Sequence, residues 1–337
     1  MGVEENLKAL SLIVSNDSIM KPPYEITPAI LKYIFSISEK IGQINAAVLF
    51  PASPHLRKQN QIKTIHASLK IEGNTLSEDQ ITAIVEKKRV IGPPKDILEV
   101  QNALEVYNQL ENFNFGSVKS FLNAHKLMMR GLIESPGNFR TKGVGIMKGD
   151  KLQHMAPPAA NVPYLIKDLF QYLNTDPDPV LIKSCVFHYE LEFIHPFMDG
   201  NGRMGRLWQS LILIKDYPIF KYFAFESLIA ESQDKYYESL SKSDKVGHST
   251  IFIEYLLQII DEALTKITQI RGRPVTQMER LHYFRSLNLN TFTRKDYMNV
   301  LKNISTATAS RDLTKGVQLG LFTSEGSGNL TTYHTKV

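Results

Sequence analysis

One short stretch of the sequence gathers side chains that could carry out chemistry on phosphates. It reads His195-Pro-Phe-Met-Asp-Gly-Asn-Gly-Arg-Met-Gly-Arg206. Its histidine is a titratable base, and Asp199 is a hard oxygen ligand of the kind that Mg²⁺ takes when phosphates supply its other ligands. Arg203 and Arg206 share one helix face and can reach the same polyanion. This set of groups is typical of phosphoryl or nucleotidyl transfer.

The backbone around this stretch predicts a loop between two helices. Pro196 disfavours the α conformation at His195, so the preceding helix should end there. A second helix is predicted from Arg203 onward. Between them, Gly200 to Gly202 tolerate positive φ and let backbone N–H groups point inward together, which makes an anion site at a helix N-terminus. The stretch is neither a Walker A loop nor an EF-hand, because both consensus spacings are absent.

A metal hydrolase is a weaker alternative interpretation of the same region. His188, Glu192 and His195 fall on one face of the predicted helix. Their spacing is not HExxH, so we interpret His188 and Glu192 as structural residues.

Composition indicates an ordinary globular protein. The chain has 337 residues, of which 43% are apolar, and a net charge of +5. Its single cysteine, Cys185, excludes an intramolecular disulfide. We expect no signal peptide and no membrane-spanning segment, hence a cytoplasmic protein with no membrane partner. The C-terminal residues 271–337 carry a balance of +6, so a basic surface is expected there only.

Helical periodicity dominates the chain, so the expected fold class is mainly α. A short apolar and glycine alternation between Phe139 and Pro158 predicts a β-hairpin instead. After a linker at 271–274, two short helical stretches, a third from Ser305 to about Gly320, and a two-stranded hairpin form a winged-helix pattern. The expected domains are an N-terminal helical region at 1–95, a core at 96–270 and a winged-helix domain at 275–337.

The stretch from His195 to Arg206 resembles the signature of the Fic-domain family, H-P-F-x-[DE]-G-N-G-R-x-x-R, with every fixed position present. The helical surroundings, from about 96 to 262, resemble a Fic core. The resemblance implies a protein adenylyltransferase (AMPylator), which transfers AMP from ATP to a hydroxyl of a protein side chain. It also implies ATP and Mg²⁺ as cofactors and a protein substrate, with the enzyme itself as one candidate target.

The resemblance assigns roles residue by residue. His195 would be the base that deprotonates the target hydroxyl, Asp199 would hold Mg²⁺, and Phe197 would anchor the loop. Arg203 would hold the β-phosphate and Arg206 the γ-phosphate. The implied ATP- and phosphate-binding residues are Gly200, Asn201, Gly202, Arg203, Met204, Gly205, Arg206 and Tyr236, with Tyr236 beside the adenine.

Two further segments extend the resemblance. The residues Val144, Gly145, Ile146 and Met147 resemble the family's flap, a hairpin that holds the target by main-chain pairing; a plain surface hairpin is the competing interpretation. Ser68 and Glu72, within Ser68-Leu-Lys-Ile-Glu-Gly-Asn74, resemble the inhibitory motif [ST]-x-x-x-E-[GN]. The motif implies that Glu72 pairs with Arg206 and occupies the charge that the γ-phosphate needs.

A second class of function stays open. The basic C-terminal segment could enter a DNA major groove with its third helix, which bears Thr306, Thr308, Ser310, Arg311 and Lys315. The alternative is therefore a nucleotide-sensing, DNA-binding transcriptional regulator. The residues leave open the target protein and its acceptor residue, whether AMP is added, removed or replaced by another nucleotide group, and whether the chain forms a homodimer.

Overall fold

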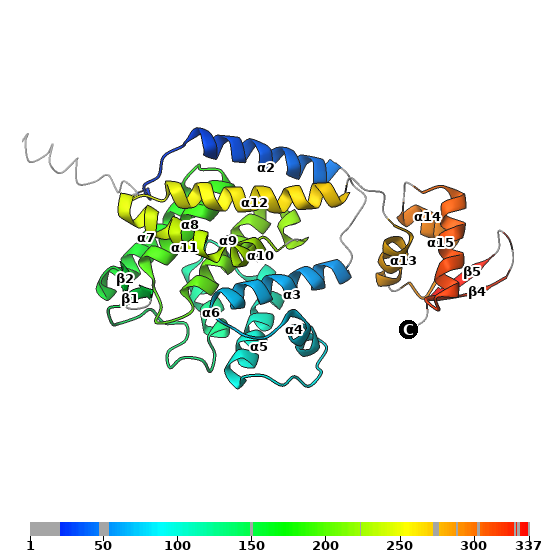
Figure 1. Cartoon of the computed structure of the whole chain (residues 1–337), viewed down its shortest axis with the longest axis horizontal. Coiled ribbons are helices and arrows are strands. Elements are labelled where there is room, and N and C mark those ends of the chain that lie inside the picture. Colours follow the sequence, from blue (N-terminus) through cyan, green and yellow to red (C-terminus); the bar gives the residue numbers. More distant parts are fainter. Residues whose placement is uncertain are drawn as a thin grey trace, which may run out of the picture.

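The structure is a computed structural model that describes residues 21–46, 54–148, 151–222, 224–271, 276–287, 289–301, 304–326, 328 and 331–335. Helices dominate it (Figure 1), as the sequence predicts. Within those residues, no helix is both long enough and apolar enough to cross a bilayer.

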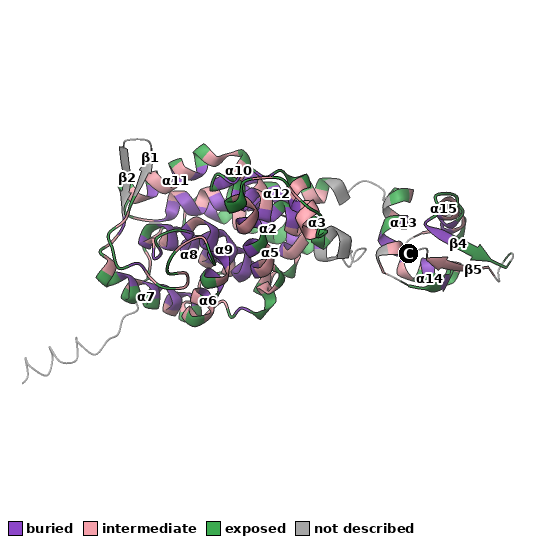
Figure 2. Cartoon of the chain, turned by 90° about the horizontal axis from the view of Figure 1, so that it is seen from below, coloured by how far each residue is buried: buried purple, intermediate pink, exposed green. Residues whose placement is uncertain are grey.

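Two antiparallel helices, α8 (Val180–Ile194) and α9 (Asn201–Asp216), form the centre of the larger body. Both are buried on nearly every side, as Figure 2 shows by colour. Such burial explains why α8 is apolar around its circumference rather than along one stripe. Trp208 of α9 packs edge-on against Phe121 and lies at the middle of this core. The loop between α8 and α9 is the stretch singled out by sequence.

The other helices of this body surround the central pair. Helix α12 (Thr250–Arg271) packs on α8 and is covered by α2 (Pro28–Ala46). The remaining elements are α3 (Pro54–Ile71), α4 (Glu78–Val85), α5 (Pro94–Asn108), η1 (Leu110–Asn112), α6 (Val118–Met128), η2 (Ala159–Asn161), α7 (Val162–Thr175), η3 (Pro218–Tyr222), α10 (Glu226–Glu231) and α11 (Gln233–Val246).

The ends of two helices are set by local backbone geometry. Helix α4 begins after Ser77, whose side chain and Gln80 form a capping box, and it ends at Val85. Lys87 adopts a positive φ of 58°, which is incompatible with a continuing helix. Helix α9 begins at Asn201, two residues earlier than predicted, because Gly200 with φ of 88° already serves as its N-cap.

A short hairpin lies beside the core. Strands β1 (Gly145–Lys148) and β2 (Lys151–Met155) pair antiparallel, with an irregularity between Ile146 and Met147. This confirms the predicted hairpin. It is the only sheet of the larger body in its described residues, so β1 and β2 each have one edge without a strand partner.

The C-terminal segment forms a second body with its own apolar core (Figure 1). It contains α13 (Gln277–Ser286), β3 (Thr291–Thr293), α14 (Arg294–Val300), α15 (Thr306–Gln318), β4 (Phe322–Glu325) and β5 (Thr332–Thr335). The three helices and the β4–β5 hairpin match the predicted pattern. Strand β3 was not predicted; it pairs with β5 to give the order β3-β5-β4. The winged-helix assignment and the domain boundaries stay predictions.

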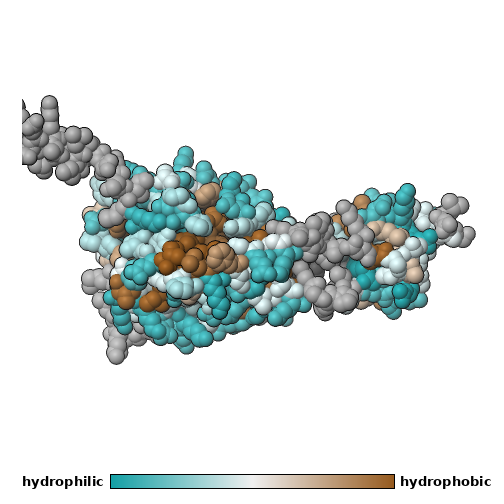
Figure 3. Space-filling model, turned by 90° about the horizontal axis from the view of Figure 1, so that it is seen from above, coloured by the Kyte–Doolittle hydropathy of each residue, from teal (hydrophilic) through white to brown (hydrophobic). Residues whose placement is uncertain are grey.

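One surface of the larger body is apolar. Viewed from the side of α2, apolar residues gather into a patch (Figure 3). Leu31 and Phe35 of α2 are 44% and 70% exposed, which is high for side chains of this kind.

Candidate active site

Helix α8 ends in a strained residue, His195. Its backbone N–H still donates to the carbonyl of Leu191 (2.9 Å), but its φ of 49° places it in the left-handed region. Non-glycine residues seldom adopt this conformation, and Pro196 explains the exit from the helix. The Nδ1 atom lies 3.4 Å from the carbonyl oxygen of Glu192. Because a carbonyl can only accept, this contact favours the tautomer in which Nε2 is the basic nitrogen.

The buried side chain of Arg140 holds the strained turn at His195 in place through hydrogen bonds. Its Nε donates to the carbonyl of His195 (2.7 Å) and its Nη2 to the carbonyl of Ile194 (3.2 Å). The same side chain also donates to the carbonyls of Lys142 and Pro157, which flank the hairpin. Arg140 is 3% exposed. It therefore links the histidine turn to the base of the hairpin.

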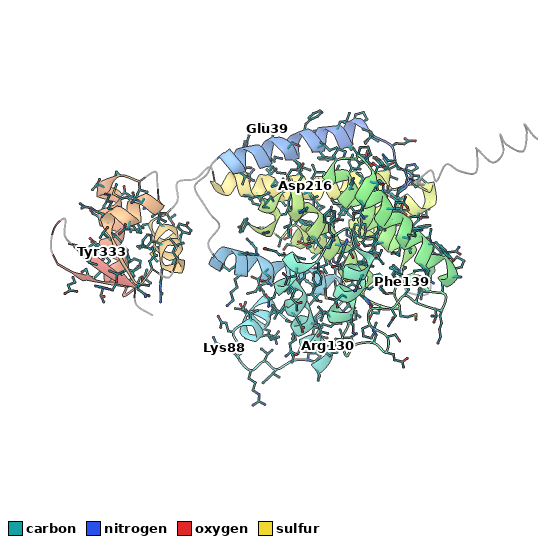
Figure 4. All side chains as sticks on the ribbon, turned by 180° about the vertical axis from the view of Figure 1, so that it is seen from behind. Glu39, Lys88, Arg130, Phe139, Asp216 and Tyr333 are labelled. Atoms are coloured by element: carbon teal, nitrogen blue, oxygen red, sulfur yellow. The ribbon has the colours of Figure 1, made fainter. Side chains whose placement is uncertain are left out.

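Phe197 and Asn201 fix the loop to the core. Phe197 is fully buried and stacks on the His125 ring with centroids 3.5 Å apart. Phe139, which is labelled in Figure 4 and precedes the hairpin in sequence, packs against the Phe197 ring. The Asn201 side chain accepts from the backbone N–H of Phe197 (2.9 Å) and donates to its carbonyl (3.0 Å). The amide side chain of Asn201 thus closes the loop, and only the backbone of this residue is left to contact a ligand.

His125 supports the loop and was missed by the sequence analysis. Its Nδ1 accepts from the backbone N–H of Gly137 (2.9 Å), so its Nε2 carries the proton that is donated to the carbonyl of Asp199 (3.0 Å). Burial lowers the pKa of His125 to about 4, so the ring is neutral near pH 7. Nothing in the sequence pattern distinguishes it from an ordinary core residue of α6.

The start of α9 is built to receive an anion. Its N-cap, Gly200, offers no side-chain hydrogen bond, so the first N–H groups of the helix have no side-chain cap in the described structure. A Cβ on Gly200 would lie 2.7 Å from the Sδ atom of Met129, so only glycine fits there. Helix N-termini with uncapped N–H groups favour negative charge.

Arg203 extends from this helix start with one unused donor. Its Nη2 lies 2.9 Å from Asp199 Oδ1, and its Nη1 lies 3.2 Å from Glu99 Oε1. Its Nε is buried and has no partner among the described residues. Glu99 in turn accepts from Asn74 through Oε2 (2.8 Å). Sequence spacing gave no signal for Glu99, which lies in α5, or for Asn74, which lies between α3 and α4.

Arg206 is buried, and its Nε and Nη2 atoms both donate to residues at the end of α3. Its Nε donates to Ser68 Oγ (3.0 Å), and its Nη2 donates to the carbonyl of Ser68 (2.9 Å) and to Glu72 Oε1 (2.7 Å). Burial alone would lower the pKa of Arg206, but the charge of Glu72 outweighs it and the pKa is raised. The structure thus brings together the three residues that the motif resemblance associates.

The end of α3 sets the position of Glu72. The N–H of Asn74 donates to the carbonyl of Leu69, and that of Gly73 to the carbonyl of Lys70, as in a Schellman motif. Gly73 has a φ of 89°, which glycine adopts without strain. Glu72 is the last residue before this reversal, and its Oε1 lies directly over Gly202. A side chain on Gly202 would collide with that oxygen.

Tyr236 and His188 form a buried network behind α9. The Tyr236 hydroxyl lies 3.0 Å from His188 Nε2 and 3.3 Å from Glu192 Oε1. Burial lowers the pKa of His188 to about 3. Tyr236 is 1% exposed, so its described role is packing, and its contact with adenine stays a prediction. His188 and Glu192 both take part in this buried network, which agrees with their interpretation as structural residues. No set of three potential metal-ligating side chains gathers in the part of the chain that the structure describes.

The base of the hairpin is connected to the His195 turn through Arg140, and its role as a flap stays a prediction. The Ala156 N–H donates to the carbonyl of Val144 (3.3 Å) and extends the pairing that begins at Gly145. The side chains of Ile146 and Met147 lie outside the described residues.

Comparison with known proteins identifies the family. Residues 115–213 match the Fic/DOC family. The crystal structure of a Fic family protein from Desulfovibrio desulfuricans G20 is 37% identical, covers 94% of this chain and 98% of that chain, and superposes with a TM-score of 0.73. This chain belongs to the Fic/DOC family.

Curated relatives carry names that specify an activity. Protein adenylyltransferase fic-1 of Caenorhabditis elegans is 26% identical over 74% of this chain and 50% of its own length. A probable protein adenylyltransferase of Aquifex aeolicus is 30% identical over 58% of this chain and 65% of its own length. This chain therefore spans half to about two thirds of the length of these two relatives.

Proposed function

We propose that this protein is an adenylyltransferase that moves AMP from ATP to a hydroxyl of a protein side chain, and that Glu72 inhibits it. The observation that carries the proposal is the loop itself, which presents His195, the uncapped start of α9 and the unused Nε of Arg203 together. The names of the curated relatives support this reaction class.

The chemistry follows from these groups. The target hydroxyl oxygen attacks the α-phosphorus and forms the new O–P bond, while the bond from that phosphorus to the departing pyrophosphate breaks. The hydroxyl proton passes to Nε2 of His195. The N–H groups of α9 and Arg203 offset the charge that builds up on the phosphate oxygens, and fixed positions matter more than covalent participation in such a transfer.

Asp199 is the residue that would hold Mg²⁺. Its side chain is 48% exposed, and the two contacts that it makes to Gly200 (2.6 Å) and Arg203 (2.9 Å) both use Oδ1. One carboxylate together with substrate phosphates is a ligand set that Mg²⁺ takes, so the residues present fit the ion. When bound, the ion would neutralise part of the phosphate charge.

The contacts of Arg206 support the inhibitory role of Glu72. A γ-phosphate needs this guanidinium, yet every contact that Arg206 donates in the structure goes to Ser68 or Glu72. A triphosphate must therefore displace Glu72, or bind with its α-phosphate away from the in-line path. Either outcome lowers the transfer rate.

Target binding is assigned to the hairpin. Strand β1 is paired with β2 on one edge only. An extended target segment could add a strand to the other edge through main-chain hydrogen bonds. The proposed flap residues are therefore Val144 to Met147.

Transfer of label from α-³²P-ATP, followed by mass spectrometry of the products, tests the proposal. Glu72→Gly should transfer AMP faster than the parent, and His195→Ala in the same background should abolish transfer. Glu86→Gly is the matched control, because Glu86 is the C-cap of α4 and the described contact of its side chain is a surface ion pair with Lys88. If Glu72→Gly is no faster than Glu86→Gly, the inhibitory role of Glu72 is refuted.

DNA binding is a second candidate function, assigned to the C-terminal body. Helix α15 buries Ala309 and Leu313 and exposes the opposite face, which bears Arg311. Binding of the full chain to duplex DNA should weaken steeply with salt. A double Arg311→Ala and Lys315→Ala variant should lower the affinity, whereas salt-independent or unchanged binding would exclude this role.

A further inference from the structure

A polar cavity of about 200 Å³ lies apart from the anion loop, between α3, α5, η3, α9 and α10. Buried side chains of three helices line it: Thr64 of α3, Ser210 of α9 and Glu226 of α10. Thr64 lies one helical turn before Ser68, and Ser210 lies one turn after Arg206. The cavity therefore continues the same contact between α3 and α9 that engages Arg206.

Two buried polar atoms in this cavity lack partners. Glu226 is 1% exposed, and its Oε1 accepts from Ser210 Oγ (2.6 Å). Its Oε2 and the hydroxyl of Tyr107 are both buried without a hydrogen-bond partner in the described part of the chain. Buried polar atoms of native proteins are nearly always hydrogen-bonded, so a donor from outside the chain is expected here.

The mouth of the cavity carries the opposite charge. Arg57 and Lys221 both pair with the single carboxylate of Glu111, Lys221 at 2.9 Å. Two cations thus share one anion, which leaves one positive charge at the mouth. A ligand that fits must be a donor at its inner end and an anion at its outer end.

We propose that this cavity binds a small zwitterion of the ω-amino acid class, with its ammonium group on Glu226 and Tyr107 and its carboxylate facing Arg57 and Lys221. A carboxylate oxygen accepts only, so Oε2 of Glu226 requires a donor, and an ammonium group supplies both donor and charge. A purely anionic ligand would place a negative charge against Glu226. A plain amine would leave the excess positive charge of Arg57 and Lys221 at the mouth without a partner.

Such a ligand would stabilise the inhibited arrangement; this part rests on the proposed function. It would contact α3 at Thr64 and α9 at Ser210, one helical turn along both helices from the contact between Ser68 and Arg206. A ligand that binds only when α3 is docked on α9 shifts the equilibrium toward that state. Ligand binding would therefore strengthen inhibition.

The affinity should depend on pH through Glu226. Burial raises the pKa of Glu226 to about 7, and the Ser210 hydroxyl, the backbone N–H of Glu226, the charge of Arg206 and the Thr64 hydroxyl oppose the rise. Burial likewise raises the pKa of Tyr107, and Lys221 and Arg57 hold the pKa of Glu111 below its usual range. Arginine and lysine side chains ordinarily keep their charge between pH 6 and 8. Since only the ionised form of Glu226 pairs with ammonium, affinity should fall about tenfold from pH 8 to pH 6.

Isothermal titration calorimetry of the full chain with 4-aminobutyrate and 5-aminovalerate tests the site directly. Saturable binding at pH 8 is expected, weakened at least tenfold by Glu226→Gln. Glu231→Gln, in the same helix but in an exposed surface pair with Lys266, should bind as the parent does. Circular dichroism melting checks that each variant folds. No saturable heat, equal binding by Glu226→Gln, or equal binding of butanol would overturn the proposal.

Hydrogen exchange separates this proposal from the proposed function. The probe should slow exchange of amides in residues 60–70 whether or not the protein transfers AMP. If transfer is observed, the probe should lower the rate of AMP transfer by the parent protein but not by Glu72→Gly. Binding without protection of α3 would refute the coupling and leave the adenylyltransferase assignment untouched.

Discussion

The guanidinium of Arg206 donates to the carboxylate of Glu72 across 2.7 Å, at the end of a helix that is 134 residues away in sequence. Arg206 is almost wholly buried, whereas the Glu72 side chain is 25% exposed. The arginine is therefore the fixed member of the pair, and the glutamate is the member that can leave.

Removal of the Glu72 carboxylate should tighten ATP binding. In a His195→Ala background, which prevents turnover, Glu72→Gly should lower the Kd for ATP with Mg²⁺ by at least about fivefold, because typical coupling between two ligands of one site lies at 1–3 kcal/mol. Calorimetric titration measures it, with Glu86→Gly as the control. An unchanged Kd would mean that Glu72 and the γ-phosphate do not compete.

Ser68 should matter more for stability than for inhibition. Ser68→Ala leaves the buried Nε of Arg206 without its acceptor, which should lower the free energy of unfolding by about 1–3 kcal/mol. It should raise AMP transfer less than Glu72→Gly does, because the Ser68 carbonyl and Glu72 still engage Nη2. Urea denaturation measures the stability, and Ser38→Ala on exposed α2 is the control. Equal stability of the two variants would count against this reading of the contact.

Acidification should destabilise the fold through His125. In the unfolded chain the ring has its ordinary pKa of 6.5, and in the folded chain burial lowers the pKa to about 4. The unfolded state therefore binds an extra proton between these values, so this contribution is complete above pH 6.5 and is lost as the pH falls toward 4. The loss approaches roughly 3 kcal/mol.

The variant His125→Gln keeps both hydrogen-bonding functions without titrating in this range. Chemical denaturation between pH 4.5 and 7.5 should show a smaller slope for it than for the parent. The buried His188 contributes in the same direction in both proteins. His334→Gln changes a half-exposed histidine and should keep the parental slope. Identical slopes for His125→Gln and the parent would contradict the assigned neutral state.

Arg140 is expected to act on the transfer rate through His195. Arg140→Lys cannot reach the carbonyls of His195, Ile194 and Pro157 together, so the imidazole should shift. In a Glu72→Gly background we expect kcat to fall by up to about a hundredfold. The Kd for ATP should stay within about twofold, because Arg140 makes no contact with the start of α9 among its described hydrogen bonds, and a difference of this size is only about 0.4 kcal/mol.

The matched control is Arg130→Lys, which alters an exposed arginine paired with Glu105 (Figure 4). It should leave kcat unchanged. A parental kcat for Arg140→Lys would show that the strained turn holds its geometry without this side chain.

Local sequence rules predicted the loop well. Pro196 marked the end of α8, because it restricts the φ and ψ values of the residue before it whatever surrounds it. The glycines at 200 and 202 marked the break between the two helices, but α9 begins at Asn201 and not at the predicted Arg203. The partnership of Glu72 with Arg206 came from the motif resemblance rather than from spacing.

The supporting residues could not be predicted in this way. His125 and Arg140 contact the loop from segments 74 and 55 residues away, and neither has a local pattern that sets it apart. Helices α10 and α11 were not assigned as elements. Helix α10 has only six residues, which is too short for a helical period to register, and α11 is mostly polar. Strand β3 is three residues long, too short for a period to register.

Glu72 and Arg206 belong to one polypeptide, and Glu72 lies at the end of α3, directly before Gly73. The carboxylate therefore faces the guanidinium at a fixed effective concentration, which dilution of the protein leaves unchanged. On the proposed mechanism, a nucleotide would have to displace a carboxylate that stays tethered to the same chain. On this basis the degree of silencing would follow the cellular ATP level and the docking of α3, independent of how many copies of the protein a cell makes.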